Sequence, residues 1–153
     1  MWNDQKSITL SLVCTWVAIA AVAAFAVSLP FAPRWFPYDD SILYDPELVA
    51  RLMPGLYGCC AAALAALVLL LLLLGAIRAG EVFTRANVRR LRAISWCSFA
   101  IFAILIVSAV LVIPTPAMIV IALTAGFFCL LMRVVKNVID AARLIKEEND
   151  FTV

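Results

Sequence analysis

Residues 61–74 read AAALAALVLLLLLL and contain only alanine, leucine and valine. Uncharged residues continue on both sides, from about Leu56 to Ile77. A helix needs about 20 mostly apolar residues to cross the hydrocarbon core of a bilayer. A run without any charged residue has no polar face to turn toward water. The stretch therefore predicts a membrane-spanning helix over residues 56–77.

Three further runs of similar composition cover residues 8–32, 94–113 and 116–135. The last two are joined by PTPA, Pro114–Ala117, and the prolines predict a tight hairpin because they stop helix continuation. Hydrophobic residues make up 66% of the chain and charged residues 14%, against about a quarter charged in soluble domains. We therefore expect an all-α fold, a four-transmembrane-helix bundle that forms one domain over residues 1–153.

The first run also has features of a secretory signal peptide. Lys6 precedes it, and AFA at Ala24–Ala26 mimics a cleavage site. The apolar run continues past this point to Ala32, which makes it long enough to span. We expect the first run to be retained as a membrane span.

The basic residues divide unequally between the two sides of the predicted bundle. Only Arg34 and Arg51 lie in the predicted outer loop, residues 33–54. Ten lie on the other side: Lys6, Arg78, Arg85, Arg89, Arg90, Arg92, Arg133, Lys136, Arg143 and Lys146. Loops rich in lysine and arginine stay in the cytoplasm. The distribution predicts a multi-pass membrane protein with both termini in the cytoplasm.

The connection after the second run, GEVFTRANVRRLRAIS at Gly80–Ser95, is strongly basic. Gly80 is a turn residue and Thr84 a predicted helix N-cap. Two stripes follow at helical spacing: Arg85, Arg89 and Arg92 form one, and Val88, Leu91 and Ser95 form the other. We predict a cytosolic amphipathic helix over residues 80–93 that lies on the membrane before the third span. Anionic lipid head groups suffice as its partner, at about 1 kcal/mol per arginine; direct nucleic-acid binding is not expected.

Residues 136–153 continue the fourth span without proline or glycine and predict a cytosolic extension that ends near Asn149. Lys136 with Asp140 and Arg143 with Glu147 have the spacing of helical ion pairs. They belong to a polar stripe of Arg133, Lys136, Asp140, Arg143 and Glu147, beside an apolar stripe of Val135, Val138, Ala142 and Ile145. The apolar stripe is expected to pack on the basic helix; docking of another protein is the alternative.

The outer loop contains DPELVARL at Asp45–Leu52, which predicts a short helix with Asp45 as N-cap and Pro46 in its first turn. Its carboxylates are Asp39, Asp40, Asp45 and Glu47. Carboxylates are ligands for Ca²⁺, but the spacing of an EF-hand is missing. We interpret the segment as a solvated acidic loop and expect neither a metal nor a cofactor.

The spans lack the groups that carry chemistry inside membranes. Apart from Arg133 near the end of the fourth run, they contain no Asp, Glu, Lys, Arg, Asn or Gln, and the chain has no His. Ionisable residues within spans mark proton relays and ion pathways, so a pump, channel or proton-coupled transporter is disfavoured. Catalytic motifs are also missing, and we expect no enzymatic activity. The five cysteines lack a CxxC pattern and are expected to pack as small hydrophobes, with Cys59-Cys60 the one pair to examine for redox chemistry.

Small residues in the spans allow helices to approach closely. Ala20 and Ala24 have suitable spacing in the first run, and Gly55 and Gly58 in the second. Hydroxyl groups in the spans, such as those of Thr15, Ser98 and Thr124, are expected to bond back to their own helices.

Two segments, GEVFTRANVRRLRAIS and IKEENDFTV at the C-terminus, resemble the bacterial family of domain of unknown function 2975. The resemblance implies four spans with both segments in the cytosol. It further implies an association with a small helix-turn-helix regulator, because genes for such regulators often neighbour those of the family. DFTV stands where Asp-Leu-Thr-Val is more usual, and no catalytic residue can be transferred.

Three functions remain open at this point. The leading hypothesis is a regulatory or scaffold partner that docks a cytosolic protein. Its surface would comprise Arg85, Arg89, Arg90, Arg92, Lys136, Asp140, Arg143, Glu147, Asp150 and Phe151. The alternatives are a receptor or carrier for a lipid or membrane-active peptide held between the spans, and a structural subunit of a larger complex or a homo-oligomer.

Overall fold

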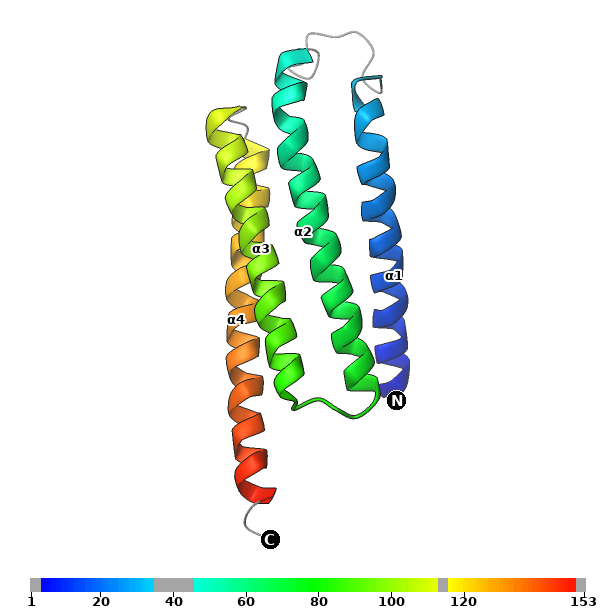
Figure 1. The fold of residues 1–153 in the computed structure, drawn as a ribbon, viewed down its shortest axis with the longest axis vertical. Coiled ribbons are helices and arrows are strands. Elements are labelled where there is room, and N and C mark those ends of the chain that lie inside the picture. Colours follow the sequence, from blue (N-terminus) through cyan, green and yellow to red (C-terminus); the bar gives the residue numbers. More distant parts are fainter. Residues whose placement is uncertain (1–3, 35–45, 113–115, 151–153) are drawn as a thin grey trace.

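The computed structural model describes residues 4–34, 46–112 and 116–150, and all regular structure within these ranges is helical. Its elements are α1 (Asp4–Ser28), the 3-10 helix η1 (Leu29–Arg34), α2 (Pro46–Arg78), α3 (Arg85–Leu111) and α4 (Pro116–Asp150). Each of the four α-helices is long and apolar enough to cross a membrane. The N-terminal end of α1, the connection between α2 and α3, and the C-terminal end of α4 share one end of the molecule (Figure 1). The predicted all-α, multi-pass membrane fold is confirmed.

The helices pack in the order in which they occur in the chain. Extensive contacts join α1 to α2, α2 to α3 and α3 to α4, while contacts between the other helix pairs are slight or absent within the described residues. The total accessible surface is 10594 Å². A compact soluble protein of this mass exposes about 7,600 Å². The excess is apolar helix surface, which a bilayer would cover.

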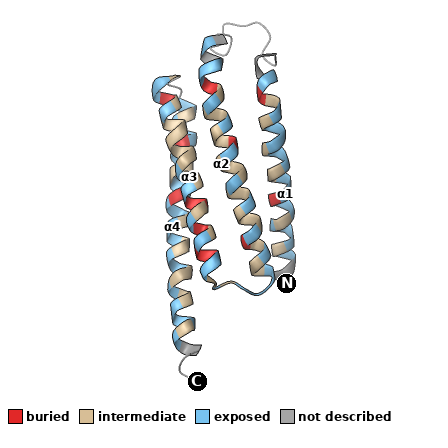
Figure 2. Cartoon of the chain, in the orientation of Figure 1, coloured by how far each residue is buried: buried red, intermediate tan, exposed pale blue. Residues whose placement is uncertain are grey.

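Buried residues are few and are most numerous in α3 (Figure 2). Leu91 and Ile94 of α3 and Ala122 and Cys129 of α4 are all buried. In the described part of α1, only Thr15 is buried. The pair formed by α3 and α4 is therefore the best-packed part of the molecule.

Glycines allow two of the close approaches between helices. A Cβ atom at Gly55 of α2 would stand 3.0 Å from the Ser108 hydroxyl of α3. At Gly126 of α4 it would stand 3.1 Å from the Phe102 ring. The predicted role of Gly55 is confirmed, as is that of Gly58 beside Ile104. Ala20 and Ala24, in contrast, are exposed on α1.

The second helix is longer than its apolar run. It begins at Pro46, the expected start of a separate short helix, and continues through Pro54 to Arg78 as one helix. A proline in a helix interior removes one hydrogen bond, here the bond to the Ala50 carbonyl. The remaining turns evidently outweigh this loss. The expected separate short helix is therefore wrong, because its residues form the first turns of α2. Asp45 lies outside the described residues.

The basic segment likewise does not form a helix of its own. Residues 85–93 are the first turns of α3, which runs without interruption to Leu111. The sequence from Arg85 to Leu111 contains neither glycine nor proline, so nothing stops the helix between its basic and apolar parts. The predicted turn between a surface helix and the third span is absent from this part of the chain.

Candidate functional site

The connection between α2 and α3 has a defined conformation that fixes the start of α3. Gly80 has a φ of 83°, in the left-handed region that favours glycine. Its amide donates to the Ile77 carbonyl at 3.0 Å, and the Glu81 amide donates to the Ala76 carbonyl at 3.0 Å. This is the Schellman arrangement that ends a helix by satisfying its last carbonyls. The turn predicted at Gly80 is confirmed.

Thr84 begins α3 as predicted. Its hydroxyl accepts a hydrogen bond from the Asn87 backbone amide at 3.3 Å. The Asn87 side chain is fully buried, and its amide group donates to the carbonyls of Glu81 at 2.6 Å and Val82 at 3.1 Å. One side chain thus satisfies two acceptors of the connection and ties it to the first turn of α3.

Arg90 extends this network to the preceding helix. One terminal nitrogen of its guanidinium donates to the Asn87 side-chain oxygen at 2.8 Å and to the Leu72 carbonyl of α2 at 3.1 Å. Arg90 is half-buried, unlike the other arginines of this segment. It joins α2 to α3 and does not form part of the exposed basic surface.

The two stripes predicted for this segment are both confirmed. Val88, Leu91 and Ser95 are buried. Arg85, Arg89 and Arg92 are exposed on the opposite face, and we call these three residues the basic stripe. Ser95 also donates to the Cys129 carbonyl of α4 at 3.2 Å, a buried hydrogen bond between helices.

The polar stripe of α4 turns toward the start of α3. Arg143 lies between two carboxylates, 3.0 Å from Asp140 and 2.7 Å from Glu147, and its side chain is only 12% exposed. Glu147 also lies 3.8 Å from Arg85 of the basic stripe. The predicted pair of Arg143 with Glu147 is confirmed, whereas Asp140 pairs with Arg143 and not with Lys136.

The apolar stripe predicted for this region is covered only in part, since Val135 and Ala142 are half-buried. Two of its four members, Val138 and Ile145, are 62% and 63% exposed. Glu147 reaches α3 through its ion pair with Arg85, and Arg143 lies between Asp140 and Glu147. The exposed side carries Val134, Val138, Ala141 and Ile145, which we call the outer face.

The outer face lies beyond the apolar part of α4. At 1.5 Å per residue, the helix is about 52 Å long, some 20 Å more than the hydrocarbon core of a bilayer. Residues 116–132 are uncharged, and charged residues begin at Arg133, so the excess length lies at the C-terminal end. In Figure 1 this end runs past the ends of the other helices.

An aromatic residue marks the boundary between the basic and apolar parts of α3. Trp96 is 58% exposed, and the guanidinium carbon of Arg133 lies 6.0 Å from the centre of its ring. Phe99 meets Trp96 edge to face, with ring centres 5.8 Å apart. Tryptophan with a basic neighbour is typical of the interface between hydrocarbon and head groups.

The remaining predicted residues do not gather into a metal or catalytic site. Lys136 is half-buried, Asp150 is the last residue of α4, and Phe151 lies outside the described residues, as do Asp39 and Asp40 of the acidic loop. In the described ranges, no three acidic, cysteine or histidine side chains are placed to hold a metal ion.

Sequence analysis missed Asn87, the most deeply buried polar residue of the described chain. Its spacing from Leu91 and Ile94, four and seven residues, puts it on the inward face of the helix. An asparagine three residues after an N-cap and on an apolar face was therefore the available signal. The Trp96–Arg133 contact depends on the register of two helices, which the sequence does not state.

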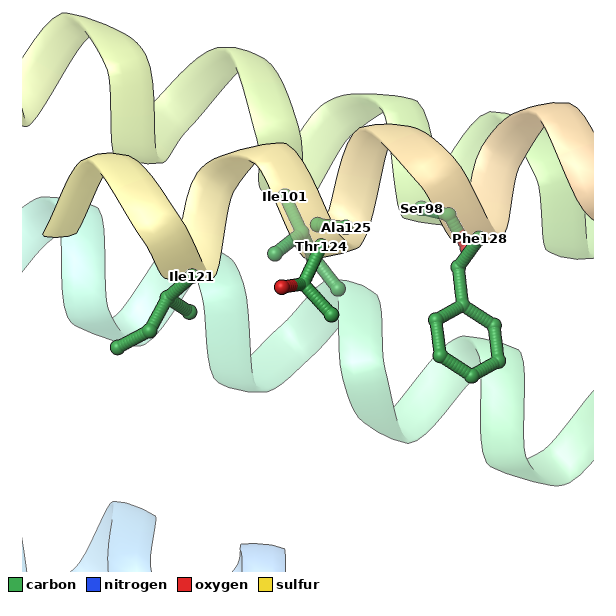
Figure 3. A pocket seen from close by; sticks show the side chains of 6 residues that line it. All are labelled: Ser98, Ile101, Ile121, Thr124, Ala125 and Phe128. Atoms are coloured by element: carbon green, nitrogen blue, oxygen red, sulfur yellow. The ribbon is translucent and has the colours of Figure 1, made fainter. Parts of the chain in front are cut away.

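The spans contain an open groove of about 340 Å³ (Figure 3). Ser98 and Ile101 of α3 and Ile121, Thr124, Ala125 and Phe128 of α4 line it. Both hydroxyls bond to their own helices, Ser98 to the Ile94 carbonyl and Thr124 to the Val120 carbonyl. The groove therefore presents an almost wholly apolar surface.

Comparison with known proteins gives one family. The family model described as "Protein of unknown function (DUF2975)" matches residues 10–153, nearly the whole chain. No curated protein and no solved structure matches the chain. The match includes both segments that carry the resemblance, the basic connection and the C-terminal IKEENDFTV. On this match, and with four apolar helices of spanning length, the chain belongs to the DUF2975 family.

Proposed function

We propose that this chain is a non-enzymatic protein of the bacterial inner membrane that docks a cytosolic regulatory or scaffold protein. Both termini would lie in the cytoplasm. Ten of the twelve basic residues belong to the end of the molecule that holds the N-terminus, the α2–α3 connection and the C-terminal part of α4 (Figure 1). The excess of lysine and arginine on that side supports the orientation.

The outer face is the observation that carries the proposal. Val134, Val138 and Ile145 are each more than 60% exposed, on a part of α4 that extends beyond the length needed to span. Contiguous apolar surface in water is a common mark of a protein interface. From Val134 to Ile145 the face covers three turns, or about 17 Å. That length suits a partner helix laid along α4.

The positive charge of the basic stripe indicates which kind of partner helix would fit. The basic stripe of α3 lies on the same end of the molecule, and Arg89 makes no ion pair with any described residue. A partner helix with an apolar face and flanking acidic residues would complement both surfaces. A small helix-turn-helix regulator, the neighbour that the family resemblance implies, is the first protein to test.

The decisive experiment titrates the purified regulator against the chain in nanodiscs. The variant Val138→Ser/Ile145→Ser removes two anchors of the outer face without changing charge. The control Val107→Ser/Val110→Ser changes two exposed valines at the opposite end of α3. We expect at least a tenfold loss of affinity for the first variant only, since two buried anchors contribute about 1.5–3 kcal/mol each. No binding by the native chain, or equal binding by both variants, would reject the proposal.

The groove supports a second candidate, a receptor or carrier for a lipid. Its volume of about 340 Å³ is at the small end of the range for ligand pockets, roughly 300–1,000 Å³. An apolar lining without free polar groups suits an acyl chain and gives no selectivity for the head group. Ala125→Leu would fill the groove. This candidate requires a co-purified lipid that the native chain retains in native mass spectrometry and that the variant loses.

A further inference from the structure

Two exposed arginines, Arg92 and Arg133, lie beside Trp96. Arg92 precedes Trp96 by four residues, which makes the two side chains neighbours on one face of α3. Arg133 approaches the same ring from α4, with its guanidinium carbon 6.0 Å from the ring centre. One exposed indole therefore has an arginine from each of two adjacent helices as its neighbour.

The depth of this cluster in a bilayer follows from helix length. Arg133 is seventeen residues after Pro116, the first residue of α4. At 1.5 Å per residue this is about 26 Å, close to the thickness of the hydrocarbon core. Phe99, one turn further along α3, is exposed on the apolar side of Trp96. The cluster thus stands at the level of lipid head groups.

Both arginines have hydrogen-bond donors to spare. Neither Arg92 nor Arg133 makes a hydrogen bond or ion pair with any described residue, and cation–π attraction to Trp96 uses none of the donors of Arg133. Arg90 and Arg143, in contrast, are engaged with carbonyl and carboxylate oxygens. The acidic residue nearest to Arg133 in the sequence of α4 is Asp140, which is already paired.

We propose that Arg92, Trp96 and Arg133 form a binding site for the head group of an anionic phospholipid. A guanidinium group presents its N–H donors in a fork that matches two oxygens of a phosphate. The indole ring holds Arg133 in place, and the adjacent aromatic surface of Trp96 and Phe99 contacts the start of the acyl chains. This site is distinct from the apolar groove and does not depend on the docking of a protein.

The site is tested by native mass spectrometry of the full chain in detergent, titrated with phosphatidylglycerol or phosphatidylcholine. We compare the native chain with Arg92→Gln/Arg133→Gln. The control, Lys6→Gln/Arg78→Gln, removes the same charge from exposed residues of α1 and α2 at the same end of the molecule. Circular dichroism and size exclusion check that each variant keeps its fold.

We expect the native chain to bind its first phosphatidylglycerol at least tenfold more tightly than phosphatidylcholine. Loss of two arginines should weaken that binding roughly 25-fold, at about fivefold for each. The control should change it less than threefold. The conservative variant Arg92→Lys/Arg133→Lys should retain part of the preference, because the charge stays while the fork is lost.

Two results would overturn the inference. An equal loss in the control would mean that net charge, and not this cluster, attracts the lipid. Full displacement of phosphatidylglycerol by millimolar inorganic phosphate would mean that the arginines hold a soluble anion and not a lipid. Because no protein partner is present, failure here leaves the docking experiment unaffected, and the reverse also holds.

Discussion

The pair α3–α4 and the helix α1 use nearly the same kinds of residue in opposite ways. Asn87, Ser95, Ala122 and Cys129 are buried between or beside α3 and α4, whereas Trp16 and Val17 of α1 are 60% and 63% exposed. Both regions have the length and hydropathy of membrane spans. Apolar character therefore decides that a segment enters the bilayer, but it does not decide how the segment packs.

The difference follows from the solvent. Lipid tails are as apolar as leucine, so a bilayer gives leucine and valine little reason to leave lipid for protein. Hydrogen bonds and close backbone approach remain as the specific forces between helices. These occur at Arg90, Ser95 and Gly126, and the described part of α1 has few comparable contacts. The following changes test this contrast, beginning with the largest expected effect.

Replacement of Asn87 by alanine should destabilise the fold most. The change leaves the carbonyls of Glu81 and Val82 without their donor and frees Arg90 from its acceptor. We expect a loss of about 2–4 kcal/mol in the free energy of unfolding, measured by titration with sodium dodecyl sulfate. Asn137→Ala, at an exposed position of α4, is the control and should stay within about 0.5 kcal/mol. Equal effects would show that the side-chain hydrogen bonds of Asn87 contribute nothing to stability.

Replacement of Gly126 by valine should force α4 away from α3. The new side chain meets the Phe102 ring, which already stands 3.1 Å from the position of a Cβ atom. Overpacking of this kind costs about 1–3 kcal/mol. Gly75→Ala is the counterpart, because no heavy atom lies within 4 Å of its Cβ position. It should raise stability slightly through helix propensity. In the same unfolding assay, Gly126→Val should lower the free energy of unfolding and Gly75→Ala should raise it.

Replacement of Ser95 by alanine should have a smaller effect. It removes the hydrogen bond to the Cys129 carbonyl. Hydrogen bonds between membrane helices contribute about 0.6 kcal/mol on average. The comparison is Ser98→Ala, whose hydroxyl bonds only to its own helix. A loss for Ser98→Ala as large as that for Ser95→Ala would remove the distinction between bonds across helices and bonds within one.

Substitution on α1 should have the smallest effect. Val17→Ala changes a side chain that is 63% exposed and faces lipid in both the folded and the unfolded state. We expect Val17→Ala to change the free energy of unfolding by less than about 0.5 kcal/mol. A loss above about 2 kcal/mol would mean that α1 is buried against a second surface, as in an oligomer. Molar mass in detergent would then identify that assembly.

Sequence reasoning was accurate where local chemistry decides the outcome. Runs without charge predict the four helices, Gly80 predicts the turn, and Thr84 predicts the start of α3. It was inaccurate where continuity decides, because residues 45–52 were expected to form a separate short helix and one helix runs from Pro46 through Pro54 to Arg78. The cost of one missing hydrogen bond is small beside the many turns that the helix retains.

The orientation of the C-terminal stripes was beyond sequence reasoning for a different reason. An apolar stripe beside a polar one normally turns its apolar side toward the protein. Here Arg143 pairs with Asp140 and Glu147 and its side chain is only 12% exposed, while Val138 and Ile145 remain exposed. Which side packs depends on a partner from α3, Arg85, whose position follows only from the register of the two helices.

The packing of each helix against its neighbours in the chain has a consequence for biogenesis. Each span meets its principal contact surface as soon as the next span, or the one before it, is in the bilayer. Assembly can therefore proceed in pace with synthesis, one hairpin after another, without a search for a distant segment. The extensive α3–α4 interface forms only when α4 enters the bilayer and closes on α3. The ion pair of Arg85 with Glu147 therefore forms after the first three spans are in place.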